Sequence, residues 1–206
     1  MDPKHPGERH HHESAVTVFT ALGREARAIG PAARVIGMRA SRMSADDALS
    51  PVVIVAGLGG GLDPTLRTGD VVVDDPGGIV PTMPGITRGR IFTSDVVIAT
   101  PADKRALFER TGAVCVDMEQ DVVRAWARGA TVVGIRAICD TADESLDPEL
   151  LGCIDAVGTP RIGRVAMLLL RRPGTPGQML RLRRASGTAL RSLGAAVRAI
   201  AARIEA

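Results

Sequence analysis

The stretch "CVDMEQDVVRAW", from Cys115 to Trp126, joins the end of an apolar run to the start of a helical pattern. The residues "TGAVCV" are typical of a buried strand, and the apolar residues after Glu119 recur at helical spacing. Carboxylates at the end of a buried strand need compensation, because an unpaired ionised group is destabilised when it leaves water. Capping of the next helix explains Asp117. It explains Glu119 less well, so Glu119 is a candidate functional residue.

Other apolar runs resemble this one. They are "AVTVFT", "ARVIGM", "PVVIVAG", "DVVVDD" and "TVVGIRAI". Strands that are apolar on both faces are typical of a sheet covered on both sides. Helical patterns lie between them over residues 24–29, 102–111 and 119–129, the last ending at Gly129, and proline- and glycine-rich loops are expected at 74–90 and 171–178. The alternation predicts an α/β fold, a single domain over residues 14–206 with a mixed central sheet flanked by helices.

Composition narrows the class of protein. The chain has 206 residues, of which 45% are hydrophobic and 24% charged, as expected for one globular domain. It has no apolar run of about 20 residues and no N-terminal apolar segment, which predicts a cytoplasmic protein. Three phenylalanines, one tryptophan and no tyrosine argue against a nucleic-acid partner bound by base stacking. The three cysteines form no CxxC pair and are expected to be reduced.

The two ends of the chain are unusual in composition. Residues 1–13, "MDPKHPGERHHHE", are expected to be disordered, and no metal site or cofactor is predicted, because the histidines lack other ligands at suitable spacing. From Arg161 onward there are ten arginines and one acid, Glu205. Residues 178–206 predict a basic amphipathic helix. Its arginines could contact an anionic surface, such as the inner face of the membrane, or form salt bridges with the acidic body, while its apolar face packs on the sheet.

Three acids follow predicted strands. Glu25 comes after "VFTALGR", Glu119 after "AVCVDM" and Asp140 after "VVGIRAIC". In an α/β sheet these ends converge on one crevice, so the three acids together are a stronger site signal than any one alone. Helix capping or simple solvation remains an alternative for each.

A glycine cluster, which includes Gly59 and Gly60, lies in "VAGLGGGLDPTLRTGDVVV", residues 55–73. Glycines let a backbone approach a ligand closely and supply unhindered N–H donors. The segment lacks a Walker lysine and the spacing of a dinucleotide fingerprint. A tight turn is the alternative interpretation.

Three segments in order resemble motifs of the nucleoside phosphorylase and methylthioadenosine/S-adenosylhomocysteine nucleosidase superfamily. They are "GLGGGLDPTLRTGDVVV", "AVCVDMEQ" and "GIRAICDTAD". The stretch "SDVVIATPADKRALFERTGAVCVDME" and the arginine-rich ending are most similar to the hopanoid-associated phosphorylase group, whose implied activity is removal of adenine from adenosylhopane. The resemblance covers Val16 to the C-terminus.

The resemblance implies roles for individual residues. Glu119 would accept hydrogen bonds from the ribose 2′- and 3′-hydroxyls, and Met118 would pack on the sugar. Asp140 would protonate the leaving purine at N7, and Glu25 would activate water. This chemistry fits an oxocarbenium-like transition state with an acid on one face and a base on the other. Asp140 would have to hold its proton through burial.

Further residues complete the implied pocket. Val97 and Ile98 match residues that line the base pocket, and Gly59 and Gly60 match the substrate-binding glycine segment. The family usually has serine where Cys139 stands and alanine or serine at Gly59. The N-terminal half is shortened between Glu25 and the glycine cluster, where the family has a glycine-rich turn and a full helix.

The sequence therefore predicts a purine nucleosidase that releases adenine from an adenosyl compound, with adenosylhopane as the expected substrate. Its partner would be a small nucleoside or an adenosyl-lipid, and it would form a homo-oligomer. Cleavage by water rather than phosphate is expected, because part of the family's phosphate-binding turn lies in the shortened region. The alternatives are a methylthioadenosine/S-adenosylhomocysteine nucleosidase and a degenerate, non-catalytic nucleoside-binding member.

Overall fold

The computed structural model describes residues 15–44, 50–147 and 175–206. The segment expected to be disordered, residues 1–13, lies outside the described residues, as do Cys153 and the arginines between positions 161 and 172.

In the described part of the chain, eight strands form one mixed sheet. They are β1 (Val16–Thr20), β2 (Ala33–Val35), β3 (Val52–Gly61), β4 (Val71–Asp74), β5 (Ile86–Arg88), β6 (Ile91–Thr93), β7 (Cys115–Asp117) and β8 (Thr131–Asp140). The main order is β2-β1-β3-β8-β4-β5, with the first four parallel and β4 antiparallel to β8. The long strand β3 also pairs with β7, which in turn pairs with β6. The parallel strands β1, β3 and β8 therefore end at the same edge.

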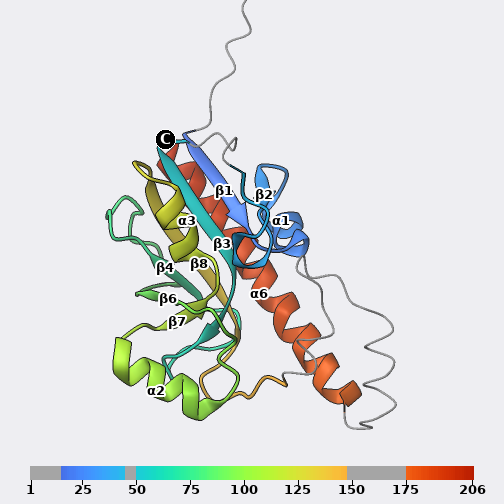
Figure 1. The fold of residues 1–206 in the computed structure, drawn as a ribbon. Coiled ribbons are helices and arrows are strands. Elements are labelled where there is room, and N and C mark those ends of the chain that lie inside the picture. The colour runs from blue at the N-terminus through green and yellow to red at the C-terminus, as the bar shows by residue number, and fades with distance from the viewer. Residues whose placement is uncertain (1–14, 45–49, 148–174) are drawn as a thin grey trace, which may run out of the picture.

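Helices cover both faces of the sheet (Figure 1). Helices α1 (Gly23–Ile29) and α6 (Thr175–Ile204) lie on one face, and α3 (Gln120–Trp126) lies on the other. Residues from β1, β3 and β8 alternate between an apolar cluster against α6 and a second cluster against α3, and β4 adds Val71 and Val73 to the first cluster. This arrangement explains why the strands are apolar on both faces.

Helix α2 (Pro101–Thr111) has clear start and stop signals. Thr100 Oγ1 accepts a hydrogen bond from Asp103 N, Pro101 occupies the first turn, and Gly112 ends the helix with φ of 65°. Leu107 packs with residues of β7 and the β3 end, so α2 is held against the edge of the sheet where β3 and β8 end.

The predicted basic amphipathic helix, α6, packs its apolar face on the sheet. Ala189, Leu193, Val197 and Ile200 are buried against the sheet, and Arg184, Arg191 and Arg198 are exposed. The Nη1 atom of Arg198 donates to the carbonyls of Ala28 and Ile29 at the end of α1. No helix among the described residues is both long and apolar enough to cross a bilayer.

The structure confirms the predicted strands and corrects several boundaries. The three-residue strands β5 and β6 were not predicted; β5 lies inside the expected loop at 74–90. Helix α3 ends at Trp126 rather than Gly129, because Ala127 leaves helical geometry with ψ of 48°. Residues 175–178 belong to α6 rather than to a loop. A proline in the first turn of a helix needs no partner for a missing N–H, so Pro176 is compatible with an earlier start.

Candidate active site

A cavity of about 190 Å³ lies where β1, β3 and β8 end. All eight residues singled out from the sequence line it: Glu25, Gly59, Gly60, Val97, Ile98, Met118, Glu119 and Asp140. The three acids come from α1, the start of α3 and the end of β8. The fold therefore brings together acids that lie far apart in the sequence, as expected for the carboxyl edge of parallel strands.

Glu25 is held by two backbone groups. Its Oε2 atom accepts from Leu22 N at 2.8 Å, and Oε1 accepts from Leu58 N at 2.9 Å. Burial raises the pKa of Glu25, while these hydrogen bonds and the charge of Arg136 oppose the rise. The bond to Leu22 caps the start of α1, so the capping alternative holds for one oxygen. The same side chain lines the cavity, where a raised pKa makes a carboxylate a stronger base.

Glu119 accepts a hydrogen bond from the shortened segment, which lies between Glu25 and the glycine cluster. Its Oε1 atom accepts from Arg39 N at 3.0 Å. Arg39 and the following Ala40 have φ of 55° and 53°, in the left-handed region that side chains other than glycine rarely adopt. Burial raises the pKa of Glu119 to about 7, with Arg136 and the Arg39 N–H acting in the opposite direction. Met38 of the same segment lines the cavity, so the shortened half still contributes to the site.

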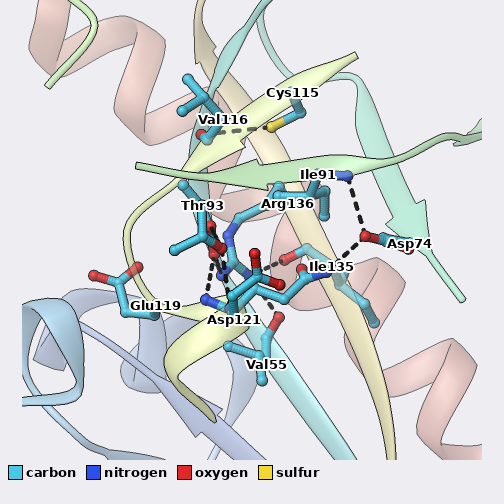
Figure 2. Close-up of polar contacts among 12 residues, drawn as sticks. Val55, Asp74, Ile91, Thr93, Cys115, Val116, Glu119, Asp121, Ile135 and Arg136 are labelled. Atoms are coloured by element: carbon cyan, nitrogen blue, oxygen red, sulfur yellow. Dashed lines mark hydrogen bonds and ion pairs between the residues drawn. The ribbon is translucent and has the colours of Figure 1, made fainter. Parts of the chain in front are cut away.

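Arg136 of β8 is buried beneath the cavity lining and is ion-paired with Asp117. Figure 2 shows its guanidinium at the centre of a network of polar contacts, with Glu119 to one side. Its Nη2 atom is ion-paired with Asp117, and Nη1 donates to the carbonyls of Val55 and Ile135. Its side chain is 1% exposed. A buried guanidinium paired with a carboxylate leaves less uncompensated charge than either group alone.

Asp117 caps the start of α3 and also links β7 to β6. Its Oδ2 atom accepts from Gln120 N at 2.9 Å, which confirms the predicted cap of α3. Its Oδ1 atom accepts from Thr93 Oγ1 at 2.7 Å, which ties β7 to β6. Together with the ion pair to Arg136, these contacts account for its burial without any ligand.

Asp140 has a cationic partner. The Nζ atom of Lys104 lies 2.6 Å from its Oδ2 atom, and the Cys139 thiol donates to Oδ1 at 3.0 Å. The thiol thus supplies the hydrogen bond for which a serine hydroxyl would also serve. Asp140 is therefore not an isolated buried carboxyl group, because a buried ammonium lies against it.

Close packing explains why positions 59 and 60 are glycines. A bulge in the β3–β8 pairing between Gly59 and Gly60 places Gly60 opposite Asp140. A Cβ atom at Gly60 would lie 3.1 Å from Asp140 Oδ2, and one at Gly59 would lie 2.6 Å from Cys115 Sγ. The protein's own side chains therefore exclude larger residues, although both glycines also line the cavity.

The mouth of the cavity is apolar. Val97 and Ile98 lie between β6 and α2, and Val96 and Val97 are 64% and 42% exposed. Met118 and Leu146 also line the wall. An apolar wall with a few polar groups is typical of sites for small organic ligands.

The polar lining is acidic. Glu25, Asp117, Glu119 and Asp140 line the cavity, and none of the described lining residues is a lysine or an arginine. Arg24 and Arg27, which flank Glu25 in the sequence, are therefore not among these lining residues. Over the described residues, no group of three or more histidines, cysteines and acids could hold a metal ion.

Sequence reasoning missed Lys104 and Arg136. Arg136 interrupts the apolar run "TVVGIRAI", and a charge inside a buried strand requires a buried partner. Lys104 lies in an otherwise ordinary helix. The sequence could have drawn attention to Lys104 only through its rarity, since Lys4 is the only other lysine among the 26 lysines and arginines.

Comparisons with solved structures show the fold. Futalosine hydrolase of Helicobacter pylori has a TM-score of 0.56 at 14% identity, over 90% of this chain and 96% of that chain. The 5′-methylthioadenosine nucleosidase of Arabidopsis thaliana has a TM-score of 0.56 at 14% identity, over 92% and 95% of the two chains. The 5′-methylthioadenosine/S-adenosyl homocysteine nucleosidase of Campylobacter jejuni has 0.57 at 14%, over 92% and 98%. No protein-family model and no curated protein matches the sequence. The predicted α/β fold is confirmed.

Proposed function

We propose that the protein is a purine nucleosidase that hydrolyses the N-glycosidic bond of an adenosyl compound and releases adenine. The observation that carries the proposal is the convergence of Glu25, Glu119 and Asp140 on one cavity with apolar walls. The similar structures include nucleosidases, which agrees with this assignment.

The three acids suit three different tasks. Asp140 passes a proton to N7 of the departing purine, so that the C1′–N9 bond breaks with its electron pair on a neutral base. Glu25 takes a proton from the attacking water, because its raised pKa makes it a better base. Glu119 accepts hydrogen bonds from the ribose hydroxyls, and its charge stabilises the oxocarbenium-like sugar. Met118 packs on the sugar, and Val97 and Ile98 flank the base.

Water is the proposed nucleophile. A phosphate dianion needs arginines or a nest of N–H donors aimed at one point. The charged side chains among the described lining residues are all carboxylates, which would repel phosphate. Arg39 N, in the shortened segment, is already bonded to Glu119.

The 5′-substituent is proposed to be apolar. Val96 and Val97 expose apolar surface at the mouth, and Leu146 and Met38 extend the apolar lining. A hydrocarbon substituent, as in adenosylhopane, would cover such a surface, and burial of apolar area stabilises by about 25 cal/mol per Å². Methylthioadenosine, with its short 5′-methylthio group, is the second candidate.

A membrane role for the basic helix is a separate proposal. Arg181, Arg184 and Arg191 are exposed on α6, whereas Arg198 is engaged with the end of α1. An apolar substrate held in a bilayer would give these arginines an anionic surface to meet. Flotation with liposomes that contain or lack anionic lipid tests this role, and salt-insensitive or absent binding would reject it. The expected homo-oligomer also stays a prediction, which sedimentation velocity can test.

Adenine release from a panel of adenosyl compounds tests the function. Purified protein is incubated with adenosylhopane, methylthioadenosine, S-adenosylhomocysteine and adenosine, and free adenine is measured by chromatography. We expect release, with the highest kcat/KM for the compound that has the largest apolar 5′-substituent. A folded protein that binds these compounds but releases no adenine would support the non-catalytic alternative.

A further inference from the structure

Lys104 is a buried cation to which the scheme above assigns no task. It lies in the first turn of α2, and its side chain is 0% exposed. The chain otherwise uses arginine for nearly all its cations, with Lys4 as the only other lysine. An arginine cannot give up a proton in a protein, whereas a buried lysine can. A lysine at position 104 can therefore donate a proton to a neighbouring group, which an arginine could not.

The Lys104 ammonium is fixed by three acceptors. Its Nζ atom lies 2.6 Å from Asp140 Oδ2, 2.7 Å from the Thr141 carbonyl and 2.9 Å from the Glu144 carbonyl. An ammonium has three hydrogens, so each has one acceptor. The Glu144 carboxylate in turn accepts from Thr141 N at 3.0 Å, which holds this loop in place. One N–H is thus aimed at the carboxylate of Asp140.

The other ionisable groups near Asp140 are poor proton sources. The Cys139 thiol donates to Oδ1, but burial and the adjacent carboxylate raise its pKa. Burial also raises the pKa of the Cys115 thiol. Glu25 and Glu119 line the same cavity, where the proposed reaction needs them ionised. Of the groups described around Asp140, Lys104 has an N–H placed to supply the proton that Asp140 passes on.

We propose that Lys104 is a positioning residue that orients Asp140 and supplies the proton that Asp140 passes to the purine. This role rests on the proposed function. As the C1′–N9 bond breaks, an Nζ–H proton of Lys104 moves to the Asp140 carboxylate and Asp140 passes a proton to N7, which leaves Lys104 as a neutral amine. The attacking water adds its hydroxyl to C1′ and gives its proton to Glu25. That proton returns through solvent to Lys104, so the enzyme is restored and the net reaction consumes one water.

Two substitutions should separate this role from a structural one. Lys104→Met removes the proton source, so Asp140 must take its proton from solvent and should do so only at low pH. Lys104→Arg retains a cation beside Asp140 but has no proton to give, so it should be inactive toward purine nucleosides at every pH. Arg105→Met is the matched control, because Arg105 is the exposed neighbour on the same helix.

The experiment compares two substrates over pH 5 to 9. One is an adenine nucleoside, and the other is 4-nitrophenyl β-D-ribofuranoside, whose leaving group needs no proton. Ionisation of Glu25 and Glu119 affects both substrates, so the ratio of their kcat/KM values isolates leaving-group protonation. Folding of each variant is checked by circular dichroism and thermal melting.

We expect wild type and Arg105→Met to share one ratio that changes little with pH. In Lys104→Met the ratio should fall about a hundredfold at pH 8, within the usual range for a general acid, and recover toward pH 5. In Lys104→Arg it should stay low throughout, so the comparison does not depend on the stability of one variant. Equal losses on both substrates, or an unchanged ratio in either variant, would overturn the proposal. A wild type that releases no adenine would instead reject the proposed function.

Discussion

The four carboxylates among the described residues that line the cavity fall into two pairs, which differ in how their charge is compensated. Asp117 and Asp140 each form an ion pair with a fully buried cation. Glu25 and Glu119 instead accept hydrogen bonds from backbone N–H groups. The aspartates come from the ends of β7 and β8, and the glutamates from the starts of α1 and α3.

This difference separates carboxylates that are paired with a buried cation from carboxylates whose pKa is raised by burial. Burial raises the pKa of Glu25, and it raises the pKa of Glu119 to about 7, so the charge of Glu119 can change near neutral pH. The aspartates each lie against a buried cation that balances their charge. Carboxylates whose environments differ in this way are typical of acid and base assignments in one active site. Four predictions test this difference between the two aspartates and the two glutamates.

Asp140→Asn should have the largest effect. Asparagine cannot relay a proton, so kcat for adenine release should fall about a thousandfold, within the range for loss of a general acid. The substitution also leaves Lys104 without its counter-ion, and breaking a buried pair costs about 3 to 5 kcal/mol. The double variant Asp140→Asn with Lys104→Met should regain stability but not activity. Recovery of activity in the double variant would show that Asp140 is structural.

Arg136→Met should mainly affect stability. It leaves Asp117 buried without a cation, so the free energy of unfolding should fall by about 3 to 5 kcal/mol. Chemical denaturation at pH 7 measures the change, with Arg124→Met as a partly exposed control for loss of one arginine. Replacing Asp117 by Asn in the same chain should recover part of the loss. An Arg136→Met protein as stable as wild type would contradict the view that this ion pair compensates the buried charge of Asp117.

Glu119→Gln should lower catalysis about a hundredfold while the protein stays folded, because a preorganised contact to a charged transition state is worth about 3 kcal/mol. Steady-state kinetics of adenine release measure the effect. The exposed Glu109→Gln on α2 is the matched control. Undiminished turnover in a folded Glu119→Gln protein would remove Glu119 from the site.

The same substitution should stabilise the protein at high pH. The folded-state pKa of Glu119, about 7, lies above the ordinary value of 4.5. The favourable contribution of its protonated form is therefore complete below pH 4.5 and is lost as pH rises through 7. Glu119→Gln keeps a neutral side chain, so its advantage over wild type should grow between pH 5 and pH 8, reaching about 3 kcal/mol at most. Melting curves across this range would show parallel behaviour of the two proteins if Glu119 were already ionised at pH 5.

Much of the fold could be predicted because continuous apolar runs mark strands buried on both faces. Strands β5 and β6 could not, because their residues, "ITR" and "IFT", do not lie in a continuous apolar run. The end of α3 was misplaced because Gly129, with φ of 91°, serves the turn after the helix rather than its cap.

The cavity-lining acids could be predicted from their place at strand ends, but their partners could not. The pairing of Lys104 with Asp140 joins α2 to β8 across 36 positions of sequence. Local patterns do not encode such a contact, and Asp140 looked like an isolated buried acid without it. The Arg39 N–H that binds Glu119 depends on a left-handed backbone at a non-glycine residue, which sequence propensity does not predict.

Adenine release with and without inorganic phosphate tests the central claim, that these carboxylates hydrolyse a purine nucleoside, most directly. Purified wild-type protein is given its best adenosyl substrate, and the sugar product is followed by phosphorus NMR and mass spectrometry. We expect the same rate in both conditions, with a free sugar and no sugar 1-phosphate as product. The reason is that the charged side chains among the described lining residues are carboxylates, which repel phosphate. A rate that requires phosphate and yields a ribose 1-phosphate would contradict it.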